Sequence, residues 1–235
     1  MNLSFVSHLQ FAKIITPINS DYDSEVGYCQ GMNFIVATLL VQMPEETAFA
    51  TFVCFMFRYN LRSLYIDHFE GLTRNLFFIE KLIKSGSDKL KRHLTECEIE
   101  PGMYAHQWVL SWFCCRFPLS FSSRVIDLLT LDRGRSNTVL IRLTVSLLLA
   151  HKNDLLNCDI DRFMAYFRYI LPMRFIPNSE TNEIEHLEEF INFYDKYRLT
   201  SFRLAQLESE WKASKSKIKL PNAFIGEFCK NCKVI

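Results

Sequence analysis

The stretch from Asn137 to Ala150 most restricts the fold, because it is apolar on nearly every side when wound as an α-helix. Such a helix is stable only inside a core or a bilayer. The stretch is shorter than the ~20 residues that a membrane span needs, and it carries Arg142. We therefore predict a buried helix at the centre of the molecule, with a partner or a path to solvent for Arg142.

Apolar residues elsewhere recur at the period of an amphipathic helix. The stretches with this pattern are residues 32–43, 45–56, 71–84, 87–97, 104–115, 120–129 and 160–171. The chain of 235 residues has only 7 Gly and 7 Pro, few for a turn-rich β protein, and 49% of it is apolar. The sequence thus predicts an all-α fold built as a single multi-helix domain.

Prolines, glycines and serines mark the predicted helix ends. Pro44 opens one helix, with two acidic residues in its first turn, and a break falls at residues 85–87. The other predicted breaks are a turn at Pro101–Gly102, a helix end at Pro118 with a cap at Ser120, and a helix end at Pro172. Tyr104, Trp108, Trp112 and Cys115 share one helix face by spacing, which is typical of a core.

Composition divides the chain into three parts. Residues 1–20 are weakly patterned, residues 21–175 carry the helical pattern, and residues 176–235 form a charged tail with a basic end. Apolar positions at steps of three and four suggest a long surface helix over residues 180–213, or the start of a coiled coil with a partner helix.

Charge and cysteine content exclude several classes of function. The 27 basic and 26 acidic residues give a net charge of +1, which argues against a nucleic-acid partner. Eight scattered cysteines indicate a reducing compartment, and Cys229 and Cys232 lack the second ligand pair of a zinc site. No phosphate-loop, zinc-protease or nucleophile-elbow motif occurs. With no secretory signal pattern, we expect a cytoplasmic protein without metal or cofactor.

The segment from Glu25 to Asn33 carries the strongest candidate for chemistry. Gly27 and Gly31 flank Gln30 there, directly before an apolar helical run. Glycine permits a sharp turn and a close approach of other groups. An amide offers both a donor and an acceptor, and so can orient a water molecule. The structural alternative is that Gln30 only caps the following helix.

The order Tyr28-Cys29-Gln30-Gly31 resembles the Tyr-x-Gln signature of the TBC domain, the family of GTPase-activating proteins for Rab GTPases. Further stretches similar to the family are residues 43–49, 103–108, 117–119 and 124–127, with Ile126 where the family usually has Trp. The likeness is good over residues 22–175 and looser over 176–213, where the chain looks like the subgroup that continues into a coiled coil.

The resemblance implies that Gln30 is a glutamine finger, which orients the attacking water at the GTP of a bound Rab. Tyr28 would pack beneath it, and Gly27 and Gly31 would support the turn and face the Rab. The implied partner is a GTP-bound Rab, and any contact with endomembranes would be indirect, through that Rab. Phosphoryl transfer suits such help, because its catalysis is mostly positioning and electrostatics.

The family's second finger, an arginine in an Ile-x-x-Asp-x-x-Arg motif, has no match. No arginine precedes Arg58, and Lys13 lacks the planar fork that spans two phosphate oxygens. The chain thus resembles a TBC domain without its opening helices, and we expect exposed apolar surface where those helices would pack.

Two alternatives remain open at this point. An arginine finger is worth about 10³–10⁵ in rate, so the chain is alternatively a Rab-binding adapter without catalysis. It is otherwise a helical scaffold unrelated to Rabs, which pairs with partners through residues 180–213.

Overall fold

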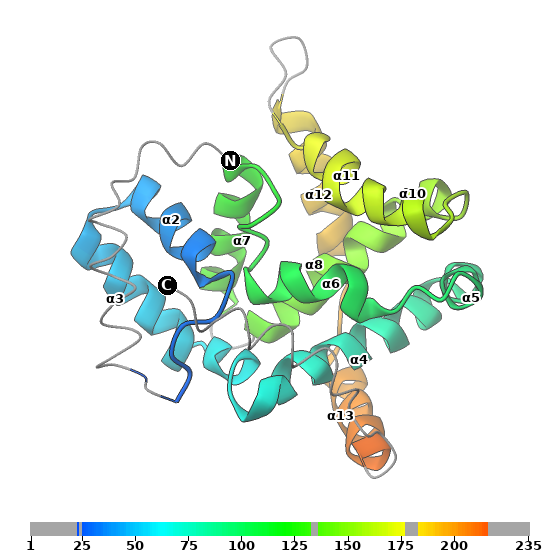
Figure 1. Cartoon of the computed structure of the whole chain (residues 1–235), viewed down its shortest axis with the longest axis horizontal. Coiled ribbons are helices and arrows are strands. Elements are labelled where there is room, and N and C mark those ends of the chain that lie inside the picture. Colours follow the sequence, from blue (N-terminus) through cyan, green and yellow to red (C-terminus); the bar gives the residue numbers. More distant parts are fainter. Residues whose placement is uncertain (1–22, 24, 133–135, 177–182, 216–235) are drawn as a thin grey trace.

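The computed structural model describes residues 23, 25–132, 136–176 and 183–215 (Figure 1). All secondary structure in these residues is helical, which confirms the predicted all-α fold. The α-helices are α2 (Met32–Gln42), α3 (Glu45–Phe57), α4 (Glu70–Gly86), α5 (Asp88–Glu96), α6 (Pro101–Leu110), α7 (Leu119–Leu131), α8 (Ser136–Ala150), α9 (Lys152–Leu155), α10 (Ile160–Ala165), α11 (Leu171–Met173), α12 (Glu183–Lys196) and α13 (Ser201–Lys215). Two 3-10 helices, η3 (Leu61–Leu64) and η4 (Asp67–Phe69), and the π-helix η5 (Tyr166–Ile170) join them. The predictions for residues 1–20 and for Cys229 and Cys232 fall outside this range.

Helix α8 lies at the centre of the fold, as predicted. Figure 1 places it in the middle of the molecule, where it contacts α4, α6, α7 and α12. Its buried side chains are Val139, Leu140, Ile141, Leu143, Thr144, Val145, Ser146, Leu147 and Leu148. Thr144 is satisfied within the helix, because its hydroxyl donates to the carbonyl oxygen of Leu140 at 2.9 Å. The helix is therefore surrounded by other helices on most of its circumference.

Arg142 has the partner that its apolar setting demands. Its Nε donates to the carbonyl oxygen of Tyr197 and its Nη2 to that of Tyr194, each at 3.0 Å. The guanidinium also lies 4.0 Å from the centre of the Tyr194 ring, a cation–π contact. Because carbonyl groups at a helix C-terminus have no partner within the helix, Arg142 satisfies them and ties the end of α12 to α8.

The predicted long helix over residues 180–213 is instead two helices. The break follows Lys196, and the hydroxyl of Thr200 then accepts a hydrogen bond from the Arg203 amide at 3.2 Å at the start of α13. Helix α12 contacts α8 and buries Phe190, whereas α13 contacts α4 and buries Trp211. Both helices thus pack on the main body. The division of the chain at residue 175 and pairing through residues 180–213 stay predictions.

Three predicted helix breaks differ from the structure, all near prolines. Pro101–Gly102 is the first turn of α6 and not a separate turn. Pro118 precedes α7 directly, and Ser120 lies inside that helix, where its hydroxyl donates to the carbonyl oxygen of Phe175 at 3.4 Å. Proline is favoured at a helix start because the amide it lacks has no acceptor there.

The helix predicted to end at Pro172 continues to Met173. The chain passes through the π-helix η5 immediately before Pro172. The wider π turn changes the hydrogen-bond register of the backbone, in a position where proline supplies no amide. The segment from α10 to α11 is therefore one continuous but irregular helical stretch.

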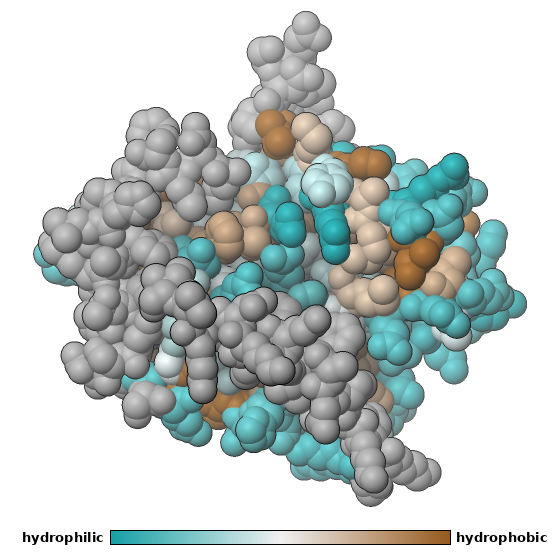
Figure 2. All heavy atoms as spheres, in the orientation of Figure 1, coloured by the Kyte–Doolittle hydropathy of each residue, from teal (hydrophilic) through white to brown (hydrophobic). Residues whose placement is uncertain are grey.

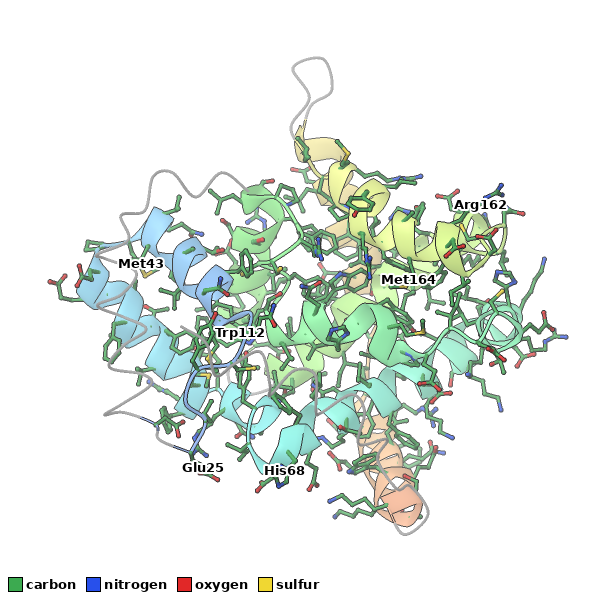
Figure 3. The ribbon with its side chains drawn as sticks, viewed as in Figure 1. Glu25, Met43, His68, Trp112, Arg162 and Met164 are labelled. Atoms are coloured by element: carbon green, nitrogen blue, oxygen red, sulfur yellow. The ribbon has the colours of Figure 1, made fainter. Side chains whose placement is uncertain are left out.

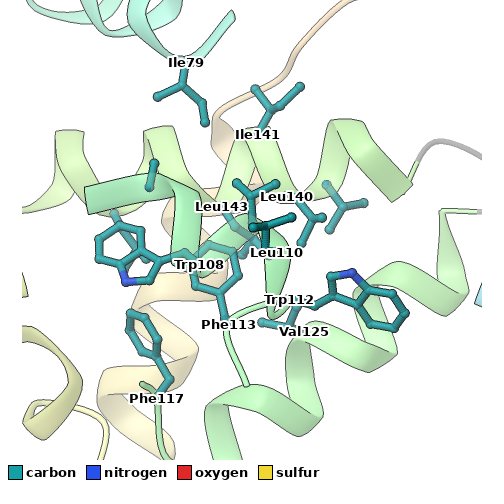
Figure 4. Packing of buried hydrophobic residues seen from close by; sticks show 14 of the residues in the cluster. Ile79, Trp108, Leu110, Trp112, Phe113, Phe117, Val125, Leu140, Ile141 and Leu143 are labelled. Carbon is teal, nitrogen blue, oxygen red and sulfur yellow. The ribbon is translucent and has the colours of Figure 1, made fainter. Parts of the chain in front are cut away.

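The two tryptophans belong to the core, as predicted, but they do not share a helix face. Helix α6 ends at Leu110, and Trp112 and Phe113 follow with φ angles of 47° and 65°. Figure 4 shows Trp108 and Trp112 pointing to opposite sides of this turn. Trp108 packs against Phe117, with ring centres 5.7 Å apart, whereas Trp112 packs against α3. The left-handed backbone at Trp112 ends the four-residue spacing on which the prediction depended.

Large apolar side chains are exposed near the end of the irregular helical stretch. They are Tyr169, Ile170, Met173 and Ile176. Figure 2 shows apolar atoms gathered over the region of α10, η5 and α11. Whether opening helices would cover such surface stays a prediction. In the described residues, no helix combines the length and the apolar character needed to cross a bilayer.

Helices η3 and α4 meet at Gly71 with no room for a side chain. A Cβ atom there would lie 2.1 Å from the carbonyl oxygen of Ser63 and 2.7 Å from its carbonyl carbon. Because backbone atoms cannot rotate away, we expect Gly71→Ala to lower the free energy of unfolding by about 2–3 kcal/mol. Urea denaturation followed by circular dichroism measures this change.

Gly86→Ala, at the other end of α4, is the matched control. Its new Cβ would lie 2.6 Å from Cδ1 of Leu149, the far end of a flexible side chain. The expected change in the free energy of unfolding is therefore within about 1 kcal/mol. Equal loss of stability in the two variants would contradict the close backbone contact at Gly71.

Candidate functional site

The segment that carries Gln30 is a turn made possible by two glycines. Gly27 and Gly31 have φ angles of 58° and 110°, in the range that side chains disfavour. The amide of Gly27 donates to the carbonyl oxygen of Asp23 at 2.8 Å, and the amide of Met32 donates to that of Cys29 at 3.1 Å. The chain thus reverses twice before α2 begins.

The two glycines have different surroundings. A Cβ atom at Gly27 would meet no atom within 4 Å, so this glycine is required only for its backbone angle. Gly31 is buried, and its Cβ would lie 3.4 Å from Cβ of Ser111, in the turn after α6. Gly31 therefore supports the turn from the inside and does not face outward.

Gln30 projects from this turn into solvent. Its neighbour Cys29 is buried, with 4% of its surface exposed, and Met32 is fully buried, whereas Gln30 is in the exposed class. The side chain of Gln30 makes no hydrogen bond within the described part of the chain, and Gly31, not Gln30, occupies the N-cap of α2 without a side-chain cap. The helix-cap alternative for Gln30 is therefore excluded. Tyr28 is half-buried and packs against the hydrophobic core.

Arg62, in η3, binds the start of the turn. Its Nε donates to Oδ2 of Asp23 at 2.6 Å and its Nη2 to Oδ1 of Asp23 at 2.8 Å. The same Nη2 donates to Oε2 of Glu25 at 2.5 Å, at the edge of the molecule (Figure 3). Hydrogen bonds from Arg62 hold the pKa of the buried Asp23 carboxyl below its usual range, so that carboxyl is ionised at neutral pH. Sequence reasoning missed this cluster, because 39 residues separate the two partners.

The inner side of η3 is part of the core. Leu61 and Leu64 are fully buried, and the hydroxyl of Tyr65 donates to the carbonyl oxygen of Leu110 at 2.7 Å. Burial raises the pKa of Tyr65 well above its usual value, which keeps this donor protonated. The 3-10 turn that presents Arg62 is therefore attached to the end of α6.

A separate hollow of about 1350 Å³ lies elsewhere, between α8, α9, α11 and α12. One wall carries Asp154, whose Oδ2 accepts hydrogen bonds from the Tyr166 hydroxyl and from Nη2 of Arg174, each at 2.9 Å. None of the predicted site residues lines this hollow. Asp154 and Arg174 satisfy each other there.

The turn offers water and hydrogen-bond chemistry, not metal chemistry. In the described residues no three His, Cys, Asp or Glu side chains are grouped to hold a metal ion. The exposed Gln30 amide has a free donor and a free acceptor, which is the equipment for orienting a water molecule or a polar group of a partner. The structure brings Gln30, Tyr28 and Gly27 together at the surface, with Gly31 behind them.

Comparison with known proteins supports the same turn. The chain matches the RabGAP TBC domain over residues 15–214. It is 38% identical over 201 residues to Rab GTPase-activating protein tbc-11 of Caenorhabditis elegans, covering 86% of this chain and 21% of that protein. It is 30% identical over 197 residues to the Ecotropic viral integration site 5 protein homolog of Homo sapiens, covering 83% and 23%. The chain thus spans only about a fifth of the length of these relatives. Because the family match covers most of the chain, this protein belongs to the RabGAP TBC domain family.

Proposed function

We propose that this chain stimulates GTP hydrolysis by a Rab GTPase and that Gln30 is its glutamine finger. The observation that carries the proposal is the exposed amide of Gln30, without a hydrogen-bond partner in the described residues, on a turn anchored to the core. The names of relatives such as Rab GTPase-activating protein tbc-11 support the same activity.

In the proposed mechanism, the Gln30 amide reaches the γ-phosphate of GTP in the Rab pocket. Its carbonyl oxygen accepts a hydrogen bond from the attacking water, and its NH₂ group donates to an oxygen near the phosphate. Tyr28, half-buried below the turn, limits the positions that the amide can adopt. A fixed amide lowers the barrier because the water no longer has to find its line of attack.

The chain supplies no arginine upstream of the turn to stabilise charge on the phosphates. No arginine precedes Arg58 in the sequence, and Arg62 beside the turn is bound to Asp23 and Glu25. We therefore propose water positioning without an arginine finger, and an acceleration of about 100-fold at most, below the 10³–10⁵ that an arginine finger supplies.

A second function follows from the same missing arginine. An adapter that binds a GTP-loaded Rab but leaves its hydrolysis unchanged would need the surface and not the chemistry. In either role the chain acts in the cytoplasm and reaches endomembranes through the Rab that it binds.

A panel of purified Rabs separates these functions. For the activator, we expect binding to at least one Rab loaded with a GTP analogue in preference to GDP, together with single-turnover hydrolysis about 10–100 times faster than the intrinsic rate. Binding with hydrolysis at the intrinsic rate would identify the adapter. No binding to any Rab would leave the helical scaffold.

A further inference from the structure

The start of the Gln30 turn is held by one side chain that comes from elsewhere in the chain. We infer that Arg62 is a positioning residue for Gln30: its fork clamps Asp23 and Glu25, so that the turn between them and α2 keeps a single conformation. This inference rests on the proposed function of Gln30 for its kinetic consequence, but the clamp itself is a property of the fold.

The two ends of the turn are held in different ways. Its downstream end continues into α2 and packs through Gly31 on Ser111, so a regular helix and the core hold it. Its upstream end has no regular structure, and its contacts converge on Asp23. The carbonyl oxygen of Asp23 accepts from the Gly27 amide at 2.8 Å, and its Oδ1 accepts from the Val26 amide at 3.3 Å. The upstream half of the turn is therefore only as fixed as Asp23 itself.

Asp23 is fixed through Arg62. A bidentate pair restricts both the distance and the plane of the carboxylate, which a single contact does not. The Asp23 side chain is 7% exposed and the Arg62 side chain 21%, so water competes weakly for these bonds. The guanidinium also lies 5.7 Å from the centre of the Phe57 ring, which adds a third contact to its position.

Both anchors of the turn lead to the same place in the core. Gly31 packs on Ser111 and lies near the carbonyl oxygen of Leu110, and that oxygen accepts the hydrogen bond from Tyr65. Tyr65 directly follows η3, the helix that carries Arg62. Gln30 thus lies on a loop that is closed on both sides onto the end of α6, and removing Arg62 opens that loop.

The same contacts argue against Arg62 as an arginine finger. Its Nε and Nη2 already donate three hydrogen bonds to two carboxylates. To reach a phosphate, the guanidinium would have to leave Asp23, a nearly buried carboxylate, without a partner, which is unfavourable. Arg62 acts through the turn and does not contact the nucleotide.

The test uses the full chain with Arg62→Met, which keeps the length of the side chain and removes its fork. Arg74→Met is the matched control, because Arg74 makes a half-exposed ion pair with Glu208 at 3.1 Å between α4 and α13. For Arg62→Met we expect hydrolysis at saturating chain to fall about tenfold, with the Kd for the Rab within about threefold, because a misplaced amide costs rate more than binding. Arg74→Met is expected to leave the rate unchanged.

Two further measurements make the inference falsifiable. In a Gln30→Ala background, Arg62→Met should cause no additional loss of rate, and a full tenfold loss there would overturn the inference. Hydrogen exchange of the Gly27 amide tests the clamp without any Rab, and we expect it to be about tenfold faster in Arg62→Met than in the control. If the unmodified chain stimulates no Rab, the proposed function fails, and unchanged exchange at Gly27 is then the result that overturns the clamp.

Discussion

Replacing Gln30 with alanine is expected to return GTP hydrolysis by the bound Rab to its intrinsic rate. The expected loss is about 100-fold at saturating chain, which corresponds to about 2.7 kcal/mol of barrier, because the attacking water loses its positioned partner. Binding should change little, since the turn is shaped by Gly27, Gly31 and Arg62 and not by the amide. Single-turnover hydrolysis and a separate binding measurement give the two values.

Gln42→Ala is the control for this substitution. Gln42 is also exposed, lies on α2, and its Nε2 donates to Oγ of Ser123 at 2.7 Å. It has the same chemistry as Gln30 but lies at the far end of the helix, so the rate should not change. Stimulated hydrolysis that survives Gln30→Ala would contradict the assignment of Gln30 and direct attention to another donor on the same surface.

Trp112→Ala is expected to lower the free energy of unfolding by about 3–5 kcal/mol. The side chain is fully buried and lies between two phenylalanines of α3, with ring centres 5.8 Å from Phe52 and 5.4 Å from Phe55. Alanine would leave a cavity that the surrounding helices cannot fill, because the chain on either side of Trp112 is held in the core. Chemical denaturation measures the loss.

Phe202→Ala gives the corresponding surface value. Phe202 lies in the first turn of α13 and is 82% exposed, so its removal should change the free energy of unfolding by less than about 0.5 kcal/mol. A loss below about 1 kcal/mol for Trp112→Ala would mean that α3 and the turn after α6 do not pack as the structure has them.

The helices were largely predictable from periodicity, because each has to bury one side against the others. The apolar stretch that became α8 is the clearest case, and Arg142 within it has the partner that burial demands. Helix ends were less predictable, because proline suits the first turn of a helix as well as the residue after its end. Pro101 and Pro118 were therefore assigned to the wrong side of a boundary.

The candidate site was predictable only in its local part. Glycines on both sides of Gln30 indicate a turn, and the turn indeed presents Gln30 to solvent. The clamp from Arg62 to Asp23 was not predictable, since no spacing rule links residues 39 positions apart. Likewise, the burial of Gly31 depends on the turn after α6, whose left-handed residues carry large aromatic side chains in place of the expected glycine.

The contact made by Arg142 has a consequence for how the molecule comes apart. The cation belongs to the innermost helix, whereas the oxygens that neutralise its demand lie close to the other end of the described chain. The last two helices cannot detach without stranding that cation among hydrocarbon side chains. Peeling from the tail is thereby discouraged, and the tail and the interior melt together.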